Sequence, residues 1–340
     1  MRGDGSVRNY LTTTIDGMAK GLFASLIVGV IVKQIGIITD IDIIIMIGQL
    51  AQYLMGACIG AGIAFTRKSG QFTMLASIIT GTLGAGSISI NFTESGAAIY
   101  TASVGEPVGA LVAVLVGVEV GKFIENRTKF DLLIVPSAVV MSGGLVGMFV
   151  SPYISILMQQ LGLIINELTM MQPLVMGILL GVSVGMILTL PISSAALCIA
   201  INITGLAAGA ALAGCSAQMV GFAVSSFREN KVSGLISQGL GTSMLQMKNI
   251  IKNPWIWIPP TVASGVCGAL STIFQIETTS IGAGMGTSGL VGQFETYSIM
   301  GYESIFKIII LHFIMPAIIS IVLSEILRKN QRIKFGDMQL

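Results

Sequence analysis

Long apolar runs recur from one end of this chain to the other, and they restrict its fold more than any other feature. Each run holds about 18 residues or more with few charges, enough for a helix to cross ~30 Å of hydrocarbon. Charged residues make up 10% of the 340 residues, against roughly 25% in soluble domains. The segments LLIVPSAVV and FKIIILHFIM do not alternate as barrel strands do. We therefore expect an all-α, polytopic helical membrane protein.

The runs predict about eight full spans together with two irregular segments. Residues 195–226 are apolar but rich in Gly, Ala, Ser and Asn, and they are too long for one upright helix. A hairpin or a broken helix is expected there. Residues 278–292 include SIGAGMGTSGLVG, which is too short and too rich in glycine to cross, so a re-entrant loop is expected. The full spans are expected near residues 20–38, 45–66, 72–90, 104–122, 131–150, 172–190, 255–275 and 305–327.

The distribution of charge predicts the orientation of these spans. Lys and Arg gather at 67–68, 122–129, 228–252 and 328–334, whereas the loops between them carry mostly Asp and Glu. Basic loops face the cytoplasm in membrane proteins. Both termini are therefore expected on the cytoplasmic side, provided that 195–226 enters and leaves from that side.

Four short segments recur in the same order, 121 to 126 residues further along the chain. For example, VKQIGII at 32–38 is echoed by MQQLGLI at 158–164, and IVPSAVVMSGG at 134–144 by IPPTVASGVCG at 258–268. We interpret residues 1–340 as a single transport-type domain with a repeat of about 124 residues, because internal repeats are common in transporters. The halves would cover about 20–143 and 144–275, before the re-entrant loop and the last span.

Glu106 is the ionisable residue of greatest interest, because it stands in GEPVGALVAVLVG at the start of an apolar run. Pro107 suits a first helical turn, so a helix is expected to begin there. One interpretation is that the free amides of this turn fix the Glu106 carboxylate, or a ligand beside it. The other is that Glu106 is only an N-terminal acid that starts the span.

His312, the only histidine, lies about a third of the way into the last span. It either bonds a neighbouring helix or has a proton-linked or substrate-contacting role. Other polar residues flank or interrupt apolar runs, and each could line a cavity or bond a helix. The substrate-binding candidates beside Glu106 and His312 are Asn91, Glu94, Asn202, Gln218 and Glu277.

The sequence argues against metal sites, nucleotide cofactors and nucleic-acid binding. One histidine and four cysteines within apolar runs do not match the usual zinc sites. GMGTSG at 284–289 matches the dinucleotide pattern GxGxxG, but it lacks the strand and helix that this motif requires. The net charge of +2 comes from basic clusters between spans, which the membrane explains. We predict no metal, no cofactor and no nucleic acid.

Four segments together resemble the membrane-embedded enzyme IIC proteins of the bacterial phosphotransferase system. They are GEPVGALVAVLVG, LPISSAALCIAINITGLAAGAA, GLGTSMLQMKNIIKNPWIWIPP and IGAGMGTSGLVGQ. The resemblance covers about residues 15–330 and is closest to the stand-alone branch that includes PfoR. In sugar-transporting members a Glu-Pro motif holds a glutamate that contacts the sugar, so the resemblance implies this role for Glu106. No family histidine motif surrounds His312.

The resemblance implies a permease for a sugar or a similar small polar solute in a bacterial plasma membrane, which is not itself an enzyme and works with separate partners.

 Those partners would be IIA- and IIB-type proteins, which would dock on the basic loop 228–253, and the family pattern also implies a homodimer. Substrate would bind between Glu106, the 195–226 region and the 278–292 loop. Two alternatives stand beside this one: a membrane sensor that regulates gene expression without transport, and a secondary transporter coupled to an ion gradient.

Overall fold

The computed structural model describes residues 4–92, 98–127 and 130–340. Most of these residues are helical, which confirms the prediction of an all-α polytopic membrane protein. The chain forms two compact units, Met1–Ile156 and Leu157–Leu340. We call them unit 1 and unit 2. The predicted repeat halves and the single transport-type domain stay predictions.

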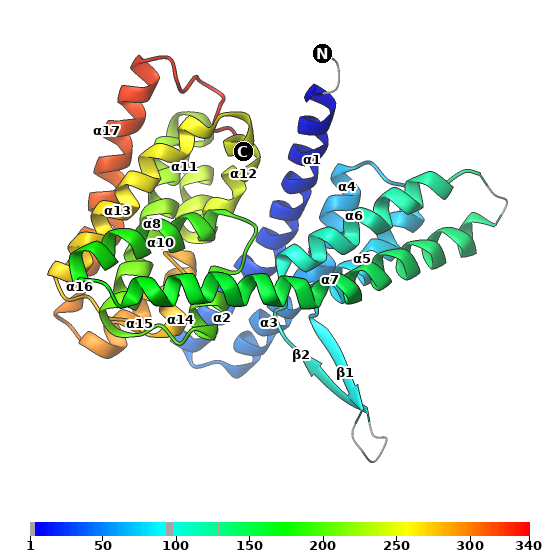
Figure 1. Cartoon of the computed structure of the whole chain (residues 1–340), viewed down its shortest axis with the longest axis horizontal. Coiled ribbons are helices and arrows are strands. Elements are labelled where there is room, and N and C mark those ends of the chain that lie inside the picture. The colour runs from blue at the N-terminus through cyan, green and yellow to red at the C-terminus, as the bar shows by residue number, and fades with distance from the viewer. Residues whose placement is uncertain (1–3, 93–97, 128–129) are drawn as a thin grey trace. The chain divides into compact units, whose positions relative to one another are not determined.

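Unit 1 is built from helices with one β-hairpin between them (Figure 1). Its first helices run on from one another through a short π-helical stretch, and α3 and α4 are bent by 51° at their junction. The elements are α1 (Asp4–Leu22), η1 (Phe23–Ile27), α2 (Val28–Thr39), α3 (Asp42–Tyr53), α4 (Met55–Thr66), α5 (Gln71–Ala85), β1 (Ile88–Phe92), β2 (Ala98–Ala102), α6 (Pro107–Ile124) and the first part of α7 (Asp131–Thr169).

The sequence analysis did not predict the hairpin. The expected span at 72–90 ends as a helix at Ala85, because Gly86 adopts a φ of +66° and closes the last turn. Strands β1 and β2 then pair antiparallel, with Ile88 opposite Ala102 and Asn91 opposite Ile99. Figure 1 shows the hairpin extending away from the helices of its unit. The predicted span was therefore too long at its C-terminal end.

Helices α4, α5 and α6 approach each other so closely that glycine is required at their contacts. A Cβ placed on Gly60 would lie 2.0 Å from the carbonyl oxygen of Ser77, and one on Gly109 would lie 2.1 Å from that of Gly84. Small residues allow this backbone contact between membrane helices. The glycines of unit 1 therefore act in packing, as their spacing predicted.

Unit 2 surrounds one buried helix, α10 (Gly205–Ser225), which packs against α8 (Pro173–Thr189), α13 (Ile258–Ile273) and α17 (Met315–Lys329). Its remaining elements are the second part of α7, α9 (Ser194–Ala200), α11 (Phe227–Ile236), η2 (Ser237–Gly241), η3 (Ser243–Gln246), α12 (Met247–Lys252), η4 (Pro254–Trp257), α14 (Ser280–Ala283), η5 (Ser288–Leu290), α15 (Val291–Met300), α16 (Ser304–Ile308) and η6 (Ile309–Ile314).

The two irregular segments of the prediction both lie in unit 2. Region 195–226 is a broken helix, because residues 201–204 interrupt it between α9 and α10. Residues 278–292 hold α14, η5 and the start of α15, and neither of the two complete helices exceeds four residues. Such short helices cannot cross a bilayer, which supports a re-entrant segment.

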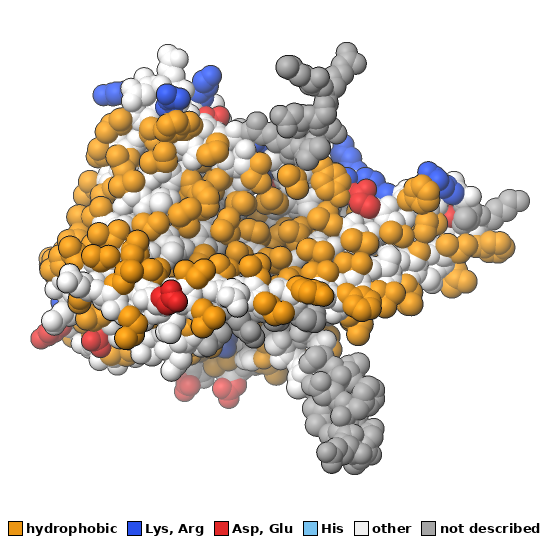
Figure 2. All heavy atoms as spheres, in the orientation of Figure 1, with side chains coloured by type: hydrophobic (Ala, Val, Ile, Leu, Met, Phe, Trp, Pro, Cys, Tyr) orange, Lys and Arg blue, Asp and Glu red, His pale blue; other side chains and the backbone are white. Residues whose placement is uncertain are grey.

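Six helices in the described part of the chain are long and apolar enough to cross a membrane, or seven if α3 and α4 form one span. The predicted span at 172–190 corresponds to α8, which is apolar but has only 17 residues. The count of eight spans stays a prediction. Figure 2 shows hydrophobic side chains over the flanks of α13 and α17, with Lys and Arg side chains visible near the end of α17. Exposed apolar flanks and charged ends are typical of helices in a bilayer.

Candidate functional site

Glu106 lies at the head of α6, as the sequence predicted. Pro107 is the first helical residue, and Glu106 is the N-cap with extended backbone angles. The Glu106 N–H donates to the carbonyl oxygen of Ala85 at 2.8 Å, and Gly105 reaches this position with a φ of +76°. A Cβ on Gly105 would lie 2.6 Å from the same oxygen. The hairpin thus returns the chain onto the end of α5 and places Glu106 there.

The side chain of Glu106 is half-buried, and it makes no capping hydrogen bond to the first turn of α6. Both interpretations of Glu106, as an acid that starts the helix and as a contact for a ligand, stay predictions. The positive end of the helix is nevertheless next to the carboxylate. This arrangement suits a carboxylate that accepts hydrogen bonds from a ligand.

The other two candidates of unit 1 are placed differently. Asn91 lies in β1 opposite Ile99, three residues along the strand from the hairpin's first pair, Ile88 and Ala102. At ~3.3 Å per residue this is about 10 Å from the base of the hairpin. Glu94 lies outside the described residues. The backbone geometry therefore separates Asn91 from the head of α6, where Glu106 lies.

In unit 2, the re-entrant segment packs against the broken helix, so the two predicted regions do meet. A Cβ on Gly209 would lie 1.9 Å from the carbonyl oxygen of Ile276, and one on Gly286 would lie 2.8 Å from Met219 Sδ. Ser194 of α9 donates to the carbonyl oxygen of Gly284 at 2.7 Å. Both halves of the broken helix therefore contact this segment.

Asn202 and Glu277 lie on the two sides of this contact. Asn202 is in the break between α9 and α10, where it is exposed and has a φ of +50°. Glu277 is exposed and directly precedes Thr278, which forms an isolated β-bridge with Gly205. The bridge brings the loop that carries Asn202 to the segment that carries Glu277. Their exposure leaves both side chains accessible to a polar ligand.

Gln218 of α10 is fully buried, and its hydrogen bonds join several elements of unit 2. Its Oε1 accepts from Trp257 Nε1 at 3.2 Å and from Thr189 Oγ1 at 3.3 Å, while its Nε2 donates to Thr261 Oγ1 at 3.1 Å. These three bonds connect α10 with α8, η4 and α13. Of the two interpretations from the sequence, the structure favours the one in which Gln218 bonds neighbouring helices.

His312 is fully buried in the π-helical turn η6. Its Nδ1 lies 3.3 Å from Gln293 Nε2, and Gln293 Nε2 also donates to Ser216 Oγ at 3.3 Å. Within the described residues, His312 Nε2 and Gln293 Oε1 are buried and have no hydrogen-bond partner. An imidazole and an amide with unused bonding capacity are suited to a polar ligand or an ordered water.

Gln293 and Ser216 are the residues that sequence reasoning missed. Gln293 ends the segment IGAGMGTSGLVGQ, and Ser216 lies two residues before Gln218 in an apolar helix. A polar side chain inside an apolar run is a signal, but many such residues bond their own helix. Only the fold shows that these two meet His312.

The loop at 228–253 is folded rather than extended, and the C-terminal residues pack onto it. Gln246 Nε2 donates to the carbonyl oxygen of Met338 at 2.9 Å, and Asn249 Nδ2 donates to that of Gln339 at 2.9 Å. Met338 is fully buried in a cluster with Phe222 and Ile250. The outer side of α11 keeps exposed apolar side chains, namely Phe227, Val232, Leu235 and Ile236.

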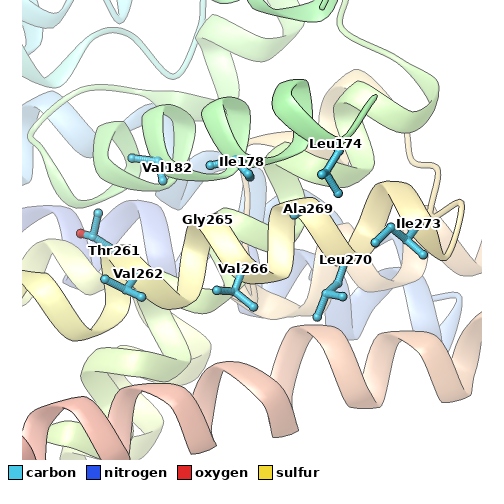
Figure 3. Close-up of a pocket in the computed structure, with 10 residues that line it drawn as sticks. All are labelled: Leu174, Ile178, Val182, Thr261, Val262, Gly265, Val266, Ala269, Leu270 and Ile273. Atoms are coloured by element: carbon cyan, nitrogen blue, oxygen red, sulfur yellow. The ribbon is translucent and has the colours of Figure 1, made fainter. Parts of the chain in front are cut away.

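An apolar groove of about 500 Å³ runs between α8 and α13 (Figure 3). Leu174, Ile178 and Val182 line it from α8, and Val266 and Ile273 are among those from α13. Thr261 is the one hydroxyl-bearing residue of its lining, and that hydroxyl already accepts from Gln218. Polar groups do not converge on the groove, so it suits hydrocarbon rather than a sugar.

Metal-binding clusters of three or more His, Cys, Asp or Glu residues do not occur in residues 4–92, 98–127 and 130–340. The four cysteines, which are Cys58, Cys198, Cys215 and Cys267, are free thiols.

A family model described as "Phosphotransferase system, EIIC" matches residues 12–340. The search of curated proteins gave no match, and neither did the search of solved structures.

Proposed function

This chain belongs to the enzyme IIC family of the phosphotransferase system, whose members are membrane permease components, and from that premise we propose that it carries a sugar or a similar small polar solute across the membrane. The phosphotransfer groups would come from separate IIA- and IIB-type partners. We also place the chain in the stand-alone, PfoR-like branch and in a bacterial plasma membrane, with both termini cytoplasmic. We propose that it works as a homodimer.

The observation that carries this proposal is the position of Glu106. Its carboxylate lies half-buried at the head of an apolar helix, and the helix does not use it as a cap. A carboxylate accepts hydrogen bonds from vicinal hydroxyls, and protein walls that exclude water strengthen each of these bonds. Such a group is the main polar contact that we assign to the solute.

Unit 2 has polar groups of its own that suit a solute. His312 Nε2 and Gln293 Oε1 keep unused bonding capacity, while Asn202 and Glu277 are exposed at the contact between the broken helix and the re-entrant segment. We propose that these four residues offer polar contacts to a solute within unit 2. Gln218 and Asn91 are secondary, because Gln218 already bonds to three neighbouring elements and Asn91 lies in the hairpin.

The partner surface that we propose consists of exposed side chains on both sides of the kink that Lys231 makes in α11. Phe227, Val232 and Ile236 are exposed there, and Arg228 and Lys231 lie among them. A soluble protein could bury these apolar side chains and pair acidic residues with the cations. The inner side of the same loop is covered by the C-terminal residues, so it is not available for docking.

The test is thermal unfolding of the purified protein with a panel of sugars, sugar alcohols and carboxylates, using Glu106→Gln and Glu167→Gln. A ligand of the native state raises the melting temperature according to RT ln(1 + [L]/Kd). We expect a sugar to stabilise the wild type and the Glu167→Gln variant, whose exposed glutamate lies on α7. Glu106→Gln should weaken binding by about tenfold or more, which is roughly 1.4 kcal/mol.

A sugar that stabilises Glu106→Gln as strongly as the wild type would remove Glu106 from the site. If none of the solutes stabilises the wild type, the transport proposal fails and the result supports the sensor alternative. A ligand that binds without flux into proteoliposomes would also favour a sensor. Uptake that stops when the proton or sodium gradient is dissipated, and that needs no phosphotransfer proteins, would indicate a secondary transporter.

A further inference from the structure

A second cavity, of about 400 Å³, lies where α17 ends, and none of the residues assigned to the solute lines it. Arg228 from the start of α11 and Arg328 from the last turn of α17 line it, together with the residues that follow α17. Those residues are Gln331, Ile333, Lys334 and Phe335. The volume is within the range of small-molecule sites, which is roughly 300–1,000 Å³.

Every charged side chain among the lining residues is basic. Arg228, Arg328 and Lys334 contribute three cations to one cavity. Arg228 pairs with Glu325 at 3.0 Å, but both side chains are largely exposed, at 60% and 37%. A pair so exposed to water is weak, so Arg228 can turn toward an anion at little cost.

Arg328 is held rigidly at the base of this cavity. Its Nη2 donates to both carboxylate oxygens of Glu229, at 2.9 and 3.1 Å, and to the carbonyl oxygen of Ser225 at 3.1 Å. The side chain of Arg328 is only 9% exposed, and within the described residues its Nε is buried without a hydrogen-bond partner. Arg328 therefore places a fixed cation, paired with Glu229, at the base of the cavity, and its unused N–H is an unsatisfied donor enclosed by the protein.

Gln331 stands where a glycine would normally be favoured. At the end of α17 the Arg332 N–H donates to the Leu327 carbonyl oxygen at 2.9 Å, and the Gln331 N–H donates to that of Arg328 at 3.0 Å. This is a Schellman turn, in which the residue at the Gln331 position is left-handed and usually Gly. Gln331 has a φ of +56°, so it adopts this conformation with a side chain that lines the cavity.

We propose that this cavity binds a phosphate group, carried either by a soluble phosphate monoester or by a lipid headgroup. Arginine forks match phosphate oxygens in geometry and charge, a lysine adds a mobile cation, and a glutamine amide adds two neutral donors. Phe335, which is 77% exposed, offers an apolar surface to the organic part of the ligand. Because α17 is the last part of the candidate span Ser304–Lys329, the cavity at its end is expected near the level of the lipid headgroups.

This proposal goes beyond the solute site and does not depend on it, because neither Glu106 nor His312 takes part. It gives the C-terminal residues a role in ligand binding. The same residues contact the 228–253 loop through Met338 and Gln339, so a phosphate group bound between Arg228 and Lys334 would hold the loop and the C-terminal residues together.

The experiment measures thermal unfolding of the full chain in phosphatidylcholine nanodiscs, titrated with glycerol 3-phosphate at constant ionic strength. Chloride at the same ionic strength and unphosphorylated glycerol are the blanks. We expect glycerol 3-phosphate to stabilise the wild type and the blanks to leave it unchanged. A parallel set of nanodiscs with phosphatidylglycerol and no soluble phosphate tests the lipid source, since stabilisation there alone would identify a headgroup as the ligand.

Two variants and a matched control make the test specific. The double variant Arg228→Gln with Lys334→Gln should raise the Kd for the stabilising phosphate source by at least tenfold, while Arg328 and its pair with Glu229 stay intact. Lys329→Gln removes an adjacent exposed cation that does not line the cavity, and it should bind as the wild type does. Gln331→Gly should keep or raise the melting temperature without ligand, because glycine relieves the left-handed strain, yet it should weaken phosphate binding.

The proposal is overturned if neither phosphate source stabilises the wild type. It is also overturned if the double variant binds phosphate as tightly as the wild type, or if Lys329→Gln loses as much affinity as the double variant does. The last result would mean general attraction to a basic surface. Glu106→Gln is expected to bind phosphate normally, so failure of the solute site and failure of this cavity give different results.

Discussion

The interiors of the two units are held together in different ways. In unit 1 two buried hydroxyls of α5 bond to their own helix, Ser77 to the carbonyl oxygen of Thr73 and Thr80 to that of Ser77. In unit 2 a buried amide, Gln218, bonds to three other elements at once. Both units have close glycine contacts, so the difference lies in the side-chain hydrogen bonds.

The polar side-chain contacts between the helices of unit 1 gather near one end of α6. Arg67 pairs with Glu119 at 2.8 Å, Lys122 donates to the carbonyl oxygen of Arg67 at 3.0 Å, and Glu125 accepts from the Gly70 N–H at 3.0 Å. The other end of α6 begins with Glu106. Among the described residues, unit 1 therefore packs mainly by shape and has Glu106 at the head of α6, whereas unit 2 packs by shape and by hydrogen bonds and keeps several polar groups inside.

The largest expected effect on stability comes from Gly60→Ala in unit 1. It tests whether close backbone contact between helices holds this unit together. The added Cβ would lie 2.0 Å from the Ser77 carbonyl oxygen, and a backbone atom cannot move aside as a side chain can. Overpacking of this kind costs about 3 kcal/mol, the upper part of the usual range. We expect a large fall in the melting temperature of the purified protein, or loss of folded protein.

The matched control is Gly144→Ala on α7 of the same unit. The atom nearest to its added Cβ is Leu83 Cδ1 at 3.1 Å, the end of a flexible side chain. Alanine also favours the helix over glycine by roughly 1 kcal/mol. This variant should be neutral or slightly more stable. Equal destabilisation by the two substitutions would contradict the idea that backbone contact holds α4 against α5.

The next effect in size is expected from Gln218→Leu in unit 2. Leucine has a similar volume but leaves the Trp257 indole N–H and the Thr189 and Thr261 hydroxyls without this partner. Hydrogen bonds between membrane helices contribute roughly 0.6 kcal/mol each, so three together give about 2 kcal/mol. The free energy of unfolding should fall by that amount in thermal or denaturant unfolding.

Gln160→Leu serves as the control, because Gln160 lies exposed on α7 within unit 2. It should change the free energy of unfolding by less than about 0.5 kcal/mol, as surface substitutions usually do. If Gln218→Leu were equally harmless, the side-chain bonds of unit 2 would not contribute to its stability. The two units would then be held together in the same way, by their close glycine contacts.

Sequence reasoning predicted the elements whose signal lies within one segment. The helix start at Pro107, the broken helix at 195–226 and the shortness of the helices at 278–292 all follow from local composition and proline or glycine chemistry. The hairpin at 88–102 was missed, because ISINF and AIYTA are as apolar as the helix that precedes them. Hydropathy alone does not separate a short strand from the end of a span.

The candidate site could be predicted only in part, because its residues meet through tertiary contacts. Glu106 was found from a motif, and His312 from its rarity. Gln293 was missed because its partners, Ser216 and His312, lie 77 and 19 residues away. Gln218 was predicted as a site residue or a helix contact, and only its three partners decide between these. The chain's own C-terminal residues were not expected on the 228–253 loop.

The smallest effect on stability is expected from His312→Leu, although His312 is as deeply buried as Gln218. Its bond to Gln293 is 3.3 Å long, and the other ring nitrogen is buried with no partner in the described residues. Leucine also removes the cost of burying the unpaired Nε2. This gain offsets much of the free energy that is lost with the bond to Gln293. The free energy of unfolding should therefore change by less than about 1 kcal/mol.

Binding should respond to His312→Leu far more than stability does, because the unused Nε2 is what we assign to the solute. With the sugar that best stabilises the wild type, the Kd should rise by about tenfold, equal to roughly 1.4 kcal/mol. Gln218→Leu is the opposite control, expected to lower stability while leaving the Kd nearly unchanged. If His312→Leu instead destabilised the protein as much as Gln218→Leu and left the Kd unchanged, the imidazole would be a packing group. The interior of unit 2 would then hold its polar residues for stability alone.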